Sequence, residues 1–311
     1  HRPQAMSSMP AGGHTLSRLA RVWQTTNAPD YVGLLLLATG WLAFEIFVTP
    51  FHRMFFINDL TISFPHAVNE RVSARESPEN LMALVYAFVF PLGVFVGYGL
   101  AFRPSLAKQE ATYLSFVVTA VLTGFLTDVV KNTVGRPRPD LLARCRPASG
   151  TEPNRLVTVD VCTAPDNRKL HDGWRSFPSG HSSQSFAGLG FLTLFLAGQL
   201  HLFRPTGGRD LCRALVCLLP LLGATLIAIS RCEDYRHDVY DVGCGAVLGL
   251  AVAYWSYRRH WPKLSSPTCD MPLPRPGSET RAAHWQRIRD EEAAVVEPET
   301  GYEMDRLSTT G

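Results

Sequence analysis

A histidine and an aspartate four positions apart form a pair whose types and spacing could do chemistry. His237 and Asp241 belong to a run of the pattern Ser-Arg-x5-His-x3-Asp that begins at Ser230. At a helix start the two side chains share one face, so the carboxylate can hold one imidazole N–H and fix the tautomer of the ring. The other ring nitrogen is then free to act as a nucleophile. The alternative is a helix-capping pair with no chemistry.

A turn before an apolar segment supplies a second reactive group. The run Phe-Pro-Ser-Gly-His-Ser places Ser179, Gly180 and His181 directly before a predicted helix. A hydroxyl and free backbone N–H groups at a helix start form a natural site for an anion, and His181 would point into it. A capped turn without chemistry is the structural alternative.

Two cations beside prolines form a third motif, of the pattern Lys-x6-Arg-Pro. Lys131 and Arg138 follow an apolar segment directly, which indicates either a rigid clamp for an anion or ordinary charge at the flank of a membrane span. Asp128 precedes Lys131 by three residues, so we expect these two side chains to form a structural ion pair on a helix.

Six long apolar segments must position these motifs. A run of about 18 or more apolar residues can cross a bilayer as a helix. Glu45 falls inside the first span, where we expect it to reach the interface or pair locally, and Pro91 predicts a kink in the second. The predicted spans are residues 31–49, 81–102, 111–130, 185–203, 211–230 and 239–257.

Basic residues in the short loops predict which side of the membrane the motifs occupy. The loop 131–184 and the turn 231–238 should lie outside the cell or in a lumen. The loop 131–184 is itself rich in Lys and Arg, so either the topology is inverted or these cations have another task, and the motifs favour the second reading. The segments assigned to the cytoplasm hold Arg18, Arg21, Arg103, Lys108, Arg204, Arg209, Arg213, Arg258, Arg259 and Lys263.

Composition excludes several classes of protein. The net charge of +3 is too small to argue for nucleic acid, and the seven cysteines include no CxxC pair that would predict zinc. Cys145 and Cys162 lie in the same outward loop, and the sequence is compatible both with a disulfide between them and with two free thiols. We expect a flexible cytoplasmic segment at 1–29, a membrane domain at 30–262, and a disordered cytoplasmic tail at 263–311.

The three motifs, in this order and on one predicted side, resemble the type 2 phosphatidic acid phosphatase superfamily, also called lipid phosphate phosphatases. The resemblance covers about residues 30–262 and includes all three signature patterns. It implies an all-α integral-membrane bundle of six transmembrane helices, of the type 2 phosphatidic acid phosphatase/haloperoxidase type. The runs GRPRPD and RSFPSGHSS look most like the diacylglycerol pyrophosphate/phosphatidate phosphatase branch. Asp238 departs from that branch, where many relatives have a second histidine, and we expect no loss of activity from it.

The resemblance also implies a role for each motif residue. His237 would attack phosphorus and form a phosphohistidine, Asp241 would orient it, and His181 would protonate the leaving lipid oxygen. The non-bridging phosphate oxygens would be held by Lys131, Arg138, Ser179, Gly180 and Arg231. No carboxylate cluster is left to hold magnesium, so we predict turnover with neither a metal nor another cofactor.

The expected substrates are lipid phosphates in the bilayer: phosphatidate, diacylglycerol pyrophosphate and lysophosphatidate. A lipid phosphotransferase or a sugar phosphatase of the same superfamily is the alternative, and a non-enzymatic membrane protein is disfavoured because both histidines are present. Resemblance suggests a vacuolar, endoplasmic reticulum or plasma membrane. The preferred lipid and the oligomeric state are not determined by the sequence.

Overall fold

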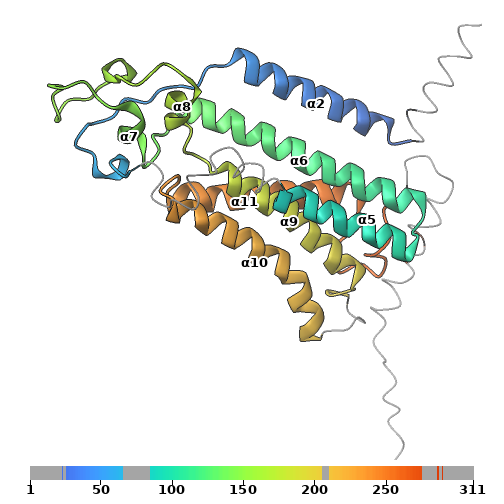
Figure 1. Ribbon diagram of the computed structural model, residues 1–311. Helices are drawn as coiled ribbons and strands as arrows, with labels where there is room; N and C mark the ends of the chain where they lie inside the picture. Colours follow the sequence, from blue (N-terminus) through green and yellow to red (C-terminus); the bar gives the residue numbers. More distant parts are fainter. Residues whose placement is uncertain are drawn as a thin grey trace, which may run out of the picture.

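The computed structural model describes residues 26–65, 85–204 and 210–274, together with residues 23, 286 and 289. Long helices dominate this part of the chain (Figure 1), and no β-strand occurs within it. The long helices are α2 (Ala28–Phe47), α5 (Phe90–Phe102), α6 (Leu106–Val134), α9 (Gly180–Gln199), α10 (Leu211–Glu233) and α11 (Val239–His260). The short helical segments are η1 (Leu60–Ile62), η2 (Val85–Val89), α7 (Leu141–Cys145), η3 (Val159–Val161), α8 (Arg168–His171) and η4 (Asp172–Trp174).

Helix α9 lies at the centre of the bundle and packs against α6, α10 and α11. Two glycines on one face of α11, Gly245 and Gly249, allow this close approach, because a Cβ at Gly245 would lie 2.7 Å from the carbonyl oxygen of Ser179. The approach brings the start of α11 beside the start of α9. The core formed with α5 and α6 is largely aromatic, and its buried rings are Phe95, Phe116, Phe191, Phe195, Tyr257 and Trp261.

Five segments of the described chain are long and apolar enough to cross a membrane: α2, Val85–Phe102, α6, α10 and α11. Each overlaps a span predicted from the sequence, although residues 81–84 of the second span lie outside the described residues. The remaining predicted span, 185–203, is represented by α9, which is not among the five. Its first turns carry Ser182, Ser183 and Gln184, and neighbouring helices surround it. The count of six spans therefore stays a prediction.

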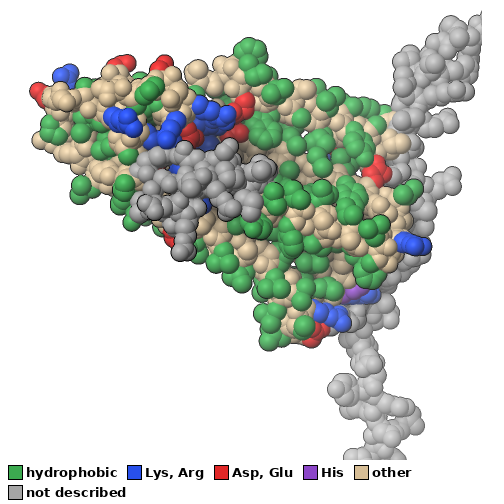
Figure 2. Space-filling model, in the orientation of Figure 1, with side chains coloured by type: hydrophobic (Ala, Val, Ile, Leu, Met, Phe, Trp, Pro, Cys, Tyr) green, Lys and Arg blue, Asp and Glu red, His purple; other side chains and the backbone are tan. Residues whose placement is uncertain are grey.

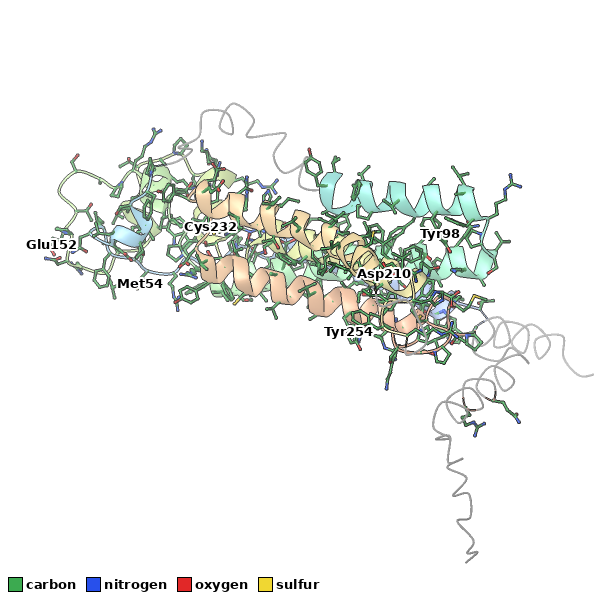
Figure 3. The ribbon with its side chains drawn as sticks, turned by 90° about the horizontal axis from the view of Figure 1, so that it is seen from below. Met54, Tyr98, Glu152, Asp210, Cys232 and Tyr254 are labelled. Carbon is green, nitrogen blue, oxygen red and sulfur yellow. A yellow bond between two sulfur atoms is a disulfide. The ribbon has the colours of Figure 1, made fainter. Side chains whose placement is uncertain are left out.

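The connections at one end of the bundle form a small folded cap (Figures 1 and 3). Figure 3 shows Met54 and Glu152 at this end and Tyr98 and Asp210 toward the opposite end. A disulfide joins Cys145 to Cys162, so the pairing left open by the sequence is present. The cap has its own apolar core, whose buried side chains are Phe55, Ile62, Leu141, Cys145, Val157, Leu170 and Trp174.

At the opposite end, the chain after α11 packs back onto the bundle. Trp261 and Cys269 are fully buried, and the Leu273 N–H donates to the His260 carbonyl at 2.8 Å. Residues 263–274 therefore depart from the predicted disordered tail, because their apolar side chains cover the end of the aromatic core. The rest of that tail lies outside the described residues apart from residues 286 and 289, as does most of the predicted N-terminal segment.

Candidate active site

A cavity of about 250 Å³ opens where the cap meets the bundle. Residues from all three sequence motifs face it: Lys131 and Arg138 from the first, Gly180 and His181 from the second, and His237 from the third. Figure 2 shows Lys and Arg side chains gathered over this end of the molecule, with acidic side chains among them. The complete lining is Gly124, Thr127, Asp128, Lys131, Arg138, Arg168, Asp172, Arg175, Gly180, His181, Gln184 and His237.

His237 lies directly before the N-cap of α11, and Asp241 lies in the first turn of that helix. His237 Nδ1 lies 3.7 Å from Asp241 Oδ2, an ion-pair distance longer than a hydrogen bond. His237 is 4% exposed, and burial together with the charges of Arg138 and Lys131 lowers its pKa to about 3, although Asp241 acts in the opposite direction. The imidazole is therefore neutral at physiological pH, with its lone pair available.

Asp241 is held by groups that the sequence motifs did not include. Its carboxylate accepts hydrogen bonds from Arg136 Nη1 at 2.7 Å and from Ser176 Oγ at 2.5 Å. Arg136 Nη2 also donates to Asp238 Oδ2 at 2.8 Å. Asp241 thus reaches His237 as a fully buried, fixed carboxylate. Arg136 lies in the Gly-Arg-Pro-Arg run. Its role became visible only from its contacts in the structure, because the sequence alone did not separate it from ordinary charge beside a membrane span.

Asp238 occupies the position where many members of the resembled branch have a second histidine, and it caps helix α11. Its side chain accepts from the Tyr240 N–H at 3.1 Å, and its own N–H donates to Asp241 Oδ2 at 3.1 Å. The two aspartates therefore form a capping box at the start of α11. The Asp238 side chain thus both caps the helix and pairs with Arg136. These two contacts explain how the structure accommodates an aspartate beside His237.

The second motif forms the start of α9. Ser179 is the N-cap: its Oγ accepts from the Ser182 N–H at 3.4 Å, and its own N–H donates to the Asp241 carbonyl at 2.9 Å. Ser179 is fully buried and does not line the cavity, whereas Gly180 and His181 do. His181 Nε2 is buried without a hydrogen-bond partner in the described part of the chain. An unpaired polar atom beside a cavity is the expected position for contact with a ligand.

Arg231 lies behind the cavity wall at the end of α10. Its Nε donates to Ser230 Oγ at 3.2 Å, and its Nη2 lies 3.7 Å from Asp234. Burial lowers the pKa of His181 most, and the positive charge of Arg231 is the next largest cause. Arg231 therefore belongs to the same charge cluster, although it does not line the cavity.

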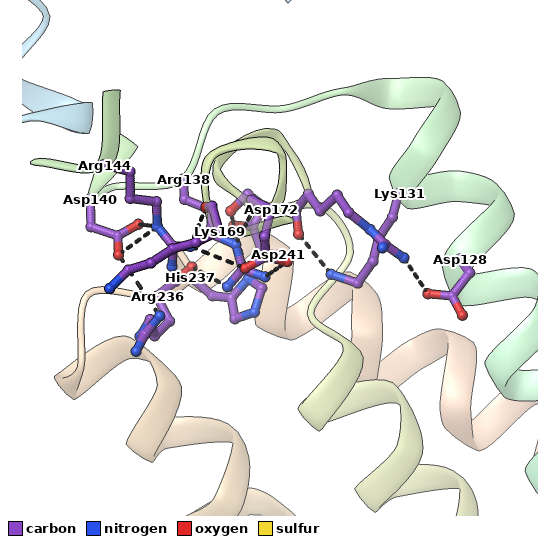
Figure 4. Close-up of polar contacts among 12 residues, drawn as sticks. Asp128, Lys131, Arg138, Asp140, Arg144, Lys169, Asp172, Arg236, His237 and Asp241 are labelled. Carbon is purple, nitrogen blue, oxygen red and sulfur yellow. Dashed lines mark hydrogen bonds and ion pairs between the residues drawn. The ribbon is translucent and has the colours of Figure 1, made fainter. Parts of the chain in front are cut away.

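The cations of the first motif are fixed by backbone oxygens and by an acidic partner (Figure 4). Lys131 Nζ donates to the Arg175 carbonyl at 2.8 Å, and Arg138 Nε donates to the Asp172 carbonyl at 2.8 Å. Arg138 Nη2 also pairs with Asp172 Oδ1 at 3.0 Å. Burial tends to raise the pKa of Asp172, but Arg138 and Arg144 outweigh it and lower that pKa, so Asp172 is an anion that orders the cations.

The predicted Asp128–Lys131 pair is wrong. Asp128 Oδ1 pairs with Arg175 at 3.0 Å, and its Oδ2 accepts from Trp41 Nε1 at 2.9 Å. The guanidinium of Arg175, from the cap, outcompetes the near neighbour on the helix because it reaches two carboxylates at once. Glu45 is the second, at 3.3 Å from Arg175, so its partner is a cap residue 130 positions away and not a local one.

Within the described ranges, no group of three or more His, Cys, Asp or Glu side chains is placed to hold a metal ion. The acidic groups that do lie at the cavity, Asp128 and Asp172, are engaged by arginines. Turnover without a metal stays a prediction.

The match to a family model supplies the class of protein. Residues 112–265 match the PAP2 superfamily, and this segment contains every motif residue discussed above. The chain belongs to the PAP2 superfamily. With its apolar helices, this membership makes it a multi-pass, all-α membrane protein.

Particular relatives are named for lipid phosphatases. The chain is 45% identical over 249 residues to "Diacylglycerol pyrophosphate phosphatase 1" of Saccharomyces cerevisiae, covering 78% of this chain and 83% of the relative. It is 40% identical over 243 residues to "Probable diacylglycerol pyrophosphate phosphatase 1" of Schizosaccharomyces pombe, covering 78% and 84%. It is 33% identical over 257 residues to "Lipid phosphate phosphatase 2" of Arabidopsis thaliana, covering 83% and 85%. No solved structure matches the chain.

Proposed function

We propose that this protein hydrolyses the phosphate monoesters and pyrophosphates of membrane lipids through a phosphohistidine intermediate. The substrates would be phosphatidate, diacylglycerol pyrophosphate and lysophosphatidate. The observation that carries the proposal is one cation-lined cavity that is lined by both His181 and His237, at one end of a bundle of apolar helices. The names of the similar yeast and plant proteins support the same substrate class.

His237 is the proposed nucleophile. Its Nδ1 side faces Asp241, which leaves Nε2 to attack the phosphorus atom in line. The P–O bond to the lipid breaks as the P–N bond forms, and His181 donates its proton to the departing oxygen. Neutral His181 then takes a proton from water, whose oxygen attacks phosphorus. The P–N bond breaks, and phosphate leaves.

The surrounding cations stabilise the charge on the transferred group. Lys131 and Arg138 face the cavity directly, and the Gly180 N–H group lies at the start of α9. Phosphoryl transfer depends chiefly on such positioning and charge neutralisation. A bound phosphate would also favour protonation of His181, because it would offset the positive charge that Arg231 places beside the ring.

We propose that the site faces a lumen or the cell exterior, in a vacuolar, endoplasmic reticulum or plasma membrane. The Cys145–Cys162 disulfide lies in the cap beside the site, and disulfides persist in oxidising compartments. Arg258 and Arg259 lie at the opposite end of α11, as the positive-inside rule requires of the cytoplasmic side. A mobility shift on reduction that is absent in Cys145→Ser would support the disulfide, whereas identical mobilities would contradict it.

The decisive experiment is phosphate release by the purified protein from a panel of lipid phosphates in detergent micelles, with and without EDTA. Release in EDTA, with a 32P-labelled, acid-labile protein intermediate, is the expected result. Loss of release in EDTA that magnesium restores would contradict metal-independent turnover. A labelled intermediate that passes phosphate to an acceptor other than water would favour a phosphotransferase, and turnover of sugar phosphates alone would favour a sugar phosphatase.

A further inference from the structure

The cavity extends beyond the phosphate-facing residues, along the helices toward the middle of the bundle. Gly124, Thr127 and Asp128 line it from α6, and Gln184 lines it from α9. Gly124 precedes Lys131 by seven residues, which is about 10 Å along a helix axis. This deeper part of the cavity is therefore long enough to receive more of a substrate than its phosphate.

Helix α2 covers one side of this deeper part. The Trp41 ring lies against Gly124, where an added Cβ would overlap it, and Trp41 Nε1 donates to Asp128 at 2.9 Å. One turn further along α2, Glu45 pairs with Arg175. The two contacts hold α2 against the site, although α2 contains no motif residue.

Gln184 places a polar group on this wall without giving it a protein partner. Its Oε1 atom is buried and accepts no hydrogen bond from the described residues. A buried carbonyl oxygen that accepts no hydrogen bond costs free energy. Ser185 also has a buried, unpaired hydroxyl on the same helix, but it does not line the cavity. Gln184 thus differs from Ser185 because its unsatisfied oxygen belongs to a residue that lines the cavity.

The position of Gln184 relative to His181 indicates what it meets. The two residues are three apart on α9, so their side chains share a face and are separated by about 4.5 Å along the axis. His181 protonates the ester oxygen of the leaving lipid in the proposed mechanism. The atoms beside Gln184 are then those a few bonds beyond that oxygen, on the side of the lipid chains.

We propose that the Gln184 amide binds the oxygen substituent on the middle glycerol carbon of the lipid substrate, and so selects glycerolipid phosphates over simple alkyl phosphates. This inference rests on the proposed function. An ester carbonyl there accepts from the amide NH2, and a free hydroxyl donates to the amide oxygen. Rotation about the terminal torsion of glutamine exchanges these two ends. Diacyl and lyso lipids would therefore both be recognised.

The test compares two substrates in the same detergent micelles: dioctanoyl phosphatidate, which has the glycerol oxygens, and dodecyl phosphate, which lacks them. Gln184→Leu removes the amide but retains a side chain of similar volume. We expect kcat/KM for phosphatidate to fall about 3- to 10-fold and that for dodecyl phosphate to change less than about twofold. Ser185→Ala, the matched control, should leave the ratio of the two values unchanged.

Each other outcome is informative. Equal losses for both substrates in Gln184→Leu would overturn the proposal, because Gln184 would then act on the reacting centre or on folding. Unchanged values for both would overturn it also. A wild-type protein that hydrolyses dodecyl phosphate but shows no preference for phosphatidate would contradict the glycerol subsite alone, whereas one that hydrolyses neither lipid would contradict the proposed function itself.

Discussion

The two ends of the bundle both contain a buried histidine on or beside α11, but the histidines differ in what they contact. At the end opposite the site, His260 Nδ1 bonds Ser115 Oγ at 2.8 Å, and its Nε2 bonds Asp30 at 3.0 Å. At the site, His181 Nε2 and His237 Nδ1 have no hydrogen-bond partner among the described residues. Among these three histidines, the unpaired ring nitrogens lie at the end that contains the cavity, where a ligand can pair with them.

The ion pairs at the two ends follow the same division. Asp30 on α2 pairs with Arg259 and His260 on α11, which joins two helix termini. At the site, Arg138 and Asp172 come from the cap and face open space within the protein. Similar residue types therefore fasten helices at one end and surround a cavity at the other.

Removal of the proposed nucleophile should have the largest effect. His237→Ala is expected to lower the rate of phosphate release by more than about 1,000-fold and to abolish the labelled intermediate, because no other group replaces the attacking nitrogen. Rates and incorporation of 32P measure this directly. Release at the wild-type rate by the purified variant would show that the mechanism is wrong.

Loss of the arginine that fixes Asp241 should have the next largest effect. Arg136→Gln removes two charge-assisted bonds, to Asp241 and Asp238, and we expect kcat to fall about 10- to 100-fold. Arg136→Lys should recover part of this loss because it keeps the charge but not both bonds. Unaltered kcat in Arg136→Gln, with thermal stability matching wild type, would remove Arg136 from the positioning of Asp241.

The satisfied histidine should affect stability rather than catalysis. His260→Leu breaks the bonds to Ser115 and Asp30, and we expect the free energy of unfolding to fall by about 1–3 kcal/mol. Thermal unfolding in detergent, with kcat/KM per folded enzyme, separates the two quantities. A catalytic loss comparable to that of His237→Ala would mean that the two ends of the bundle do not differ as described.

Of the changes considered, a shift to moderately acidic pH should have the smallest effect on catalysis by the nucleophile. The pKa of His237 is lowered to about 3, below the ordinary value of 6.5, so protonation blocks its lone pair only under strongly acidic conditions. An unperturbed imidazole would lose about 30-fold in its neutral fraction by pH 5. We expect kcat/KM, corrected for ionisation of the substrate phosphate, to show no acid limb near pH 6.5. An acid limb near pH 6.5 that persists in variants of the other titratable groups would mean that His237 lies in a more solvated site.

The sequence determined the spans and the motif residues of this protein. Long apolar runs and short-range spacing require no knowledge of distant parts of the chain, so five helices fall on predicted spans and the histidines of two motifs reach one cavity. The Asp128–Lys131 pair was also a short-range inference, and it is wrong because Arg175 approaches from the cap. Short-range spacing identifies which partners are within reach, and a distant residue can still displace them.

Only the tertiary structure decided which groups support the site. Arg136 becomes the partner of Asp241, Ser179 becomes a buried cap, and Gln184 faces the cavity because α9 and α11 approach closely and the cap folds over their ends. Residues 263–274 join the bundle for a similar reason, since the end of the aromatic core offers them a surface to cover. These contacts join segments far apart in the chain, and no local pattern specifies which distant surfaces will meet.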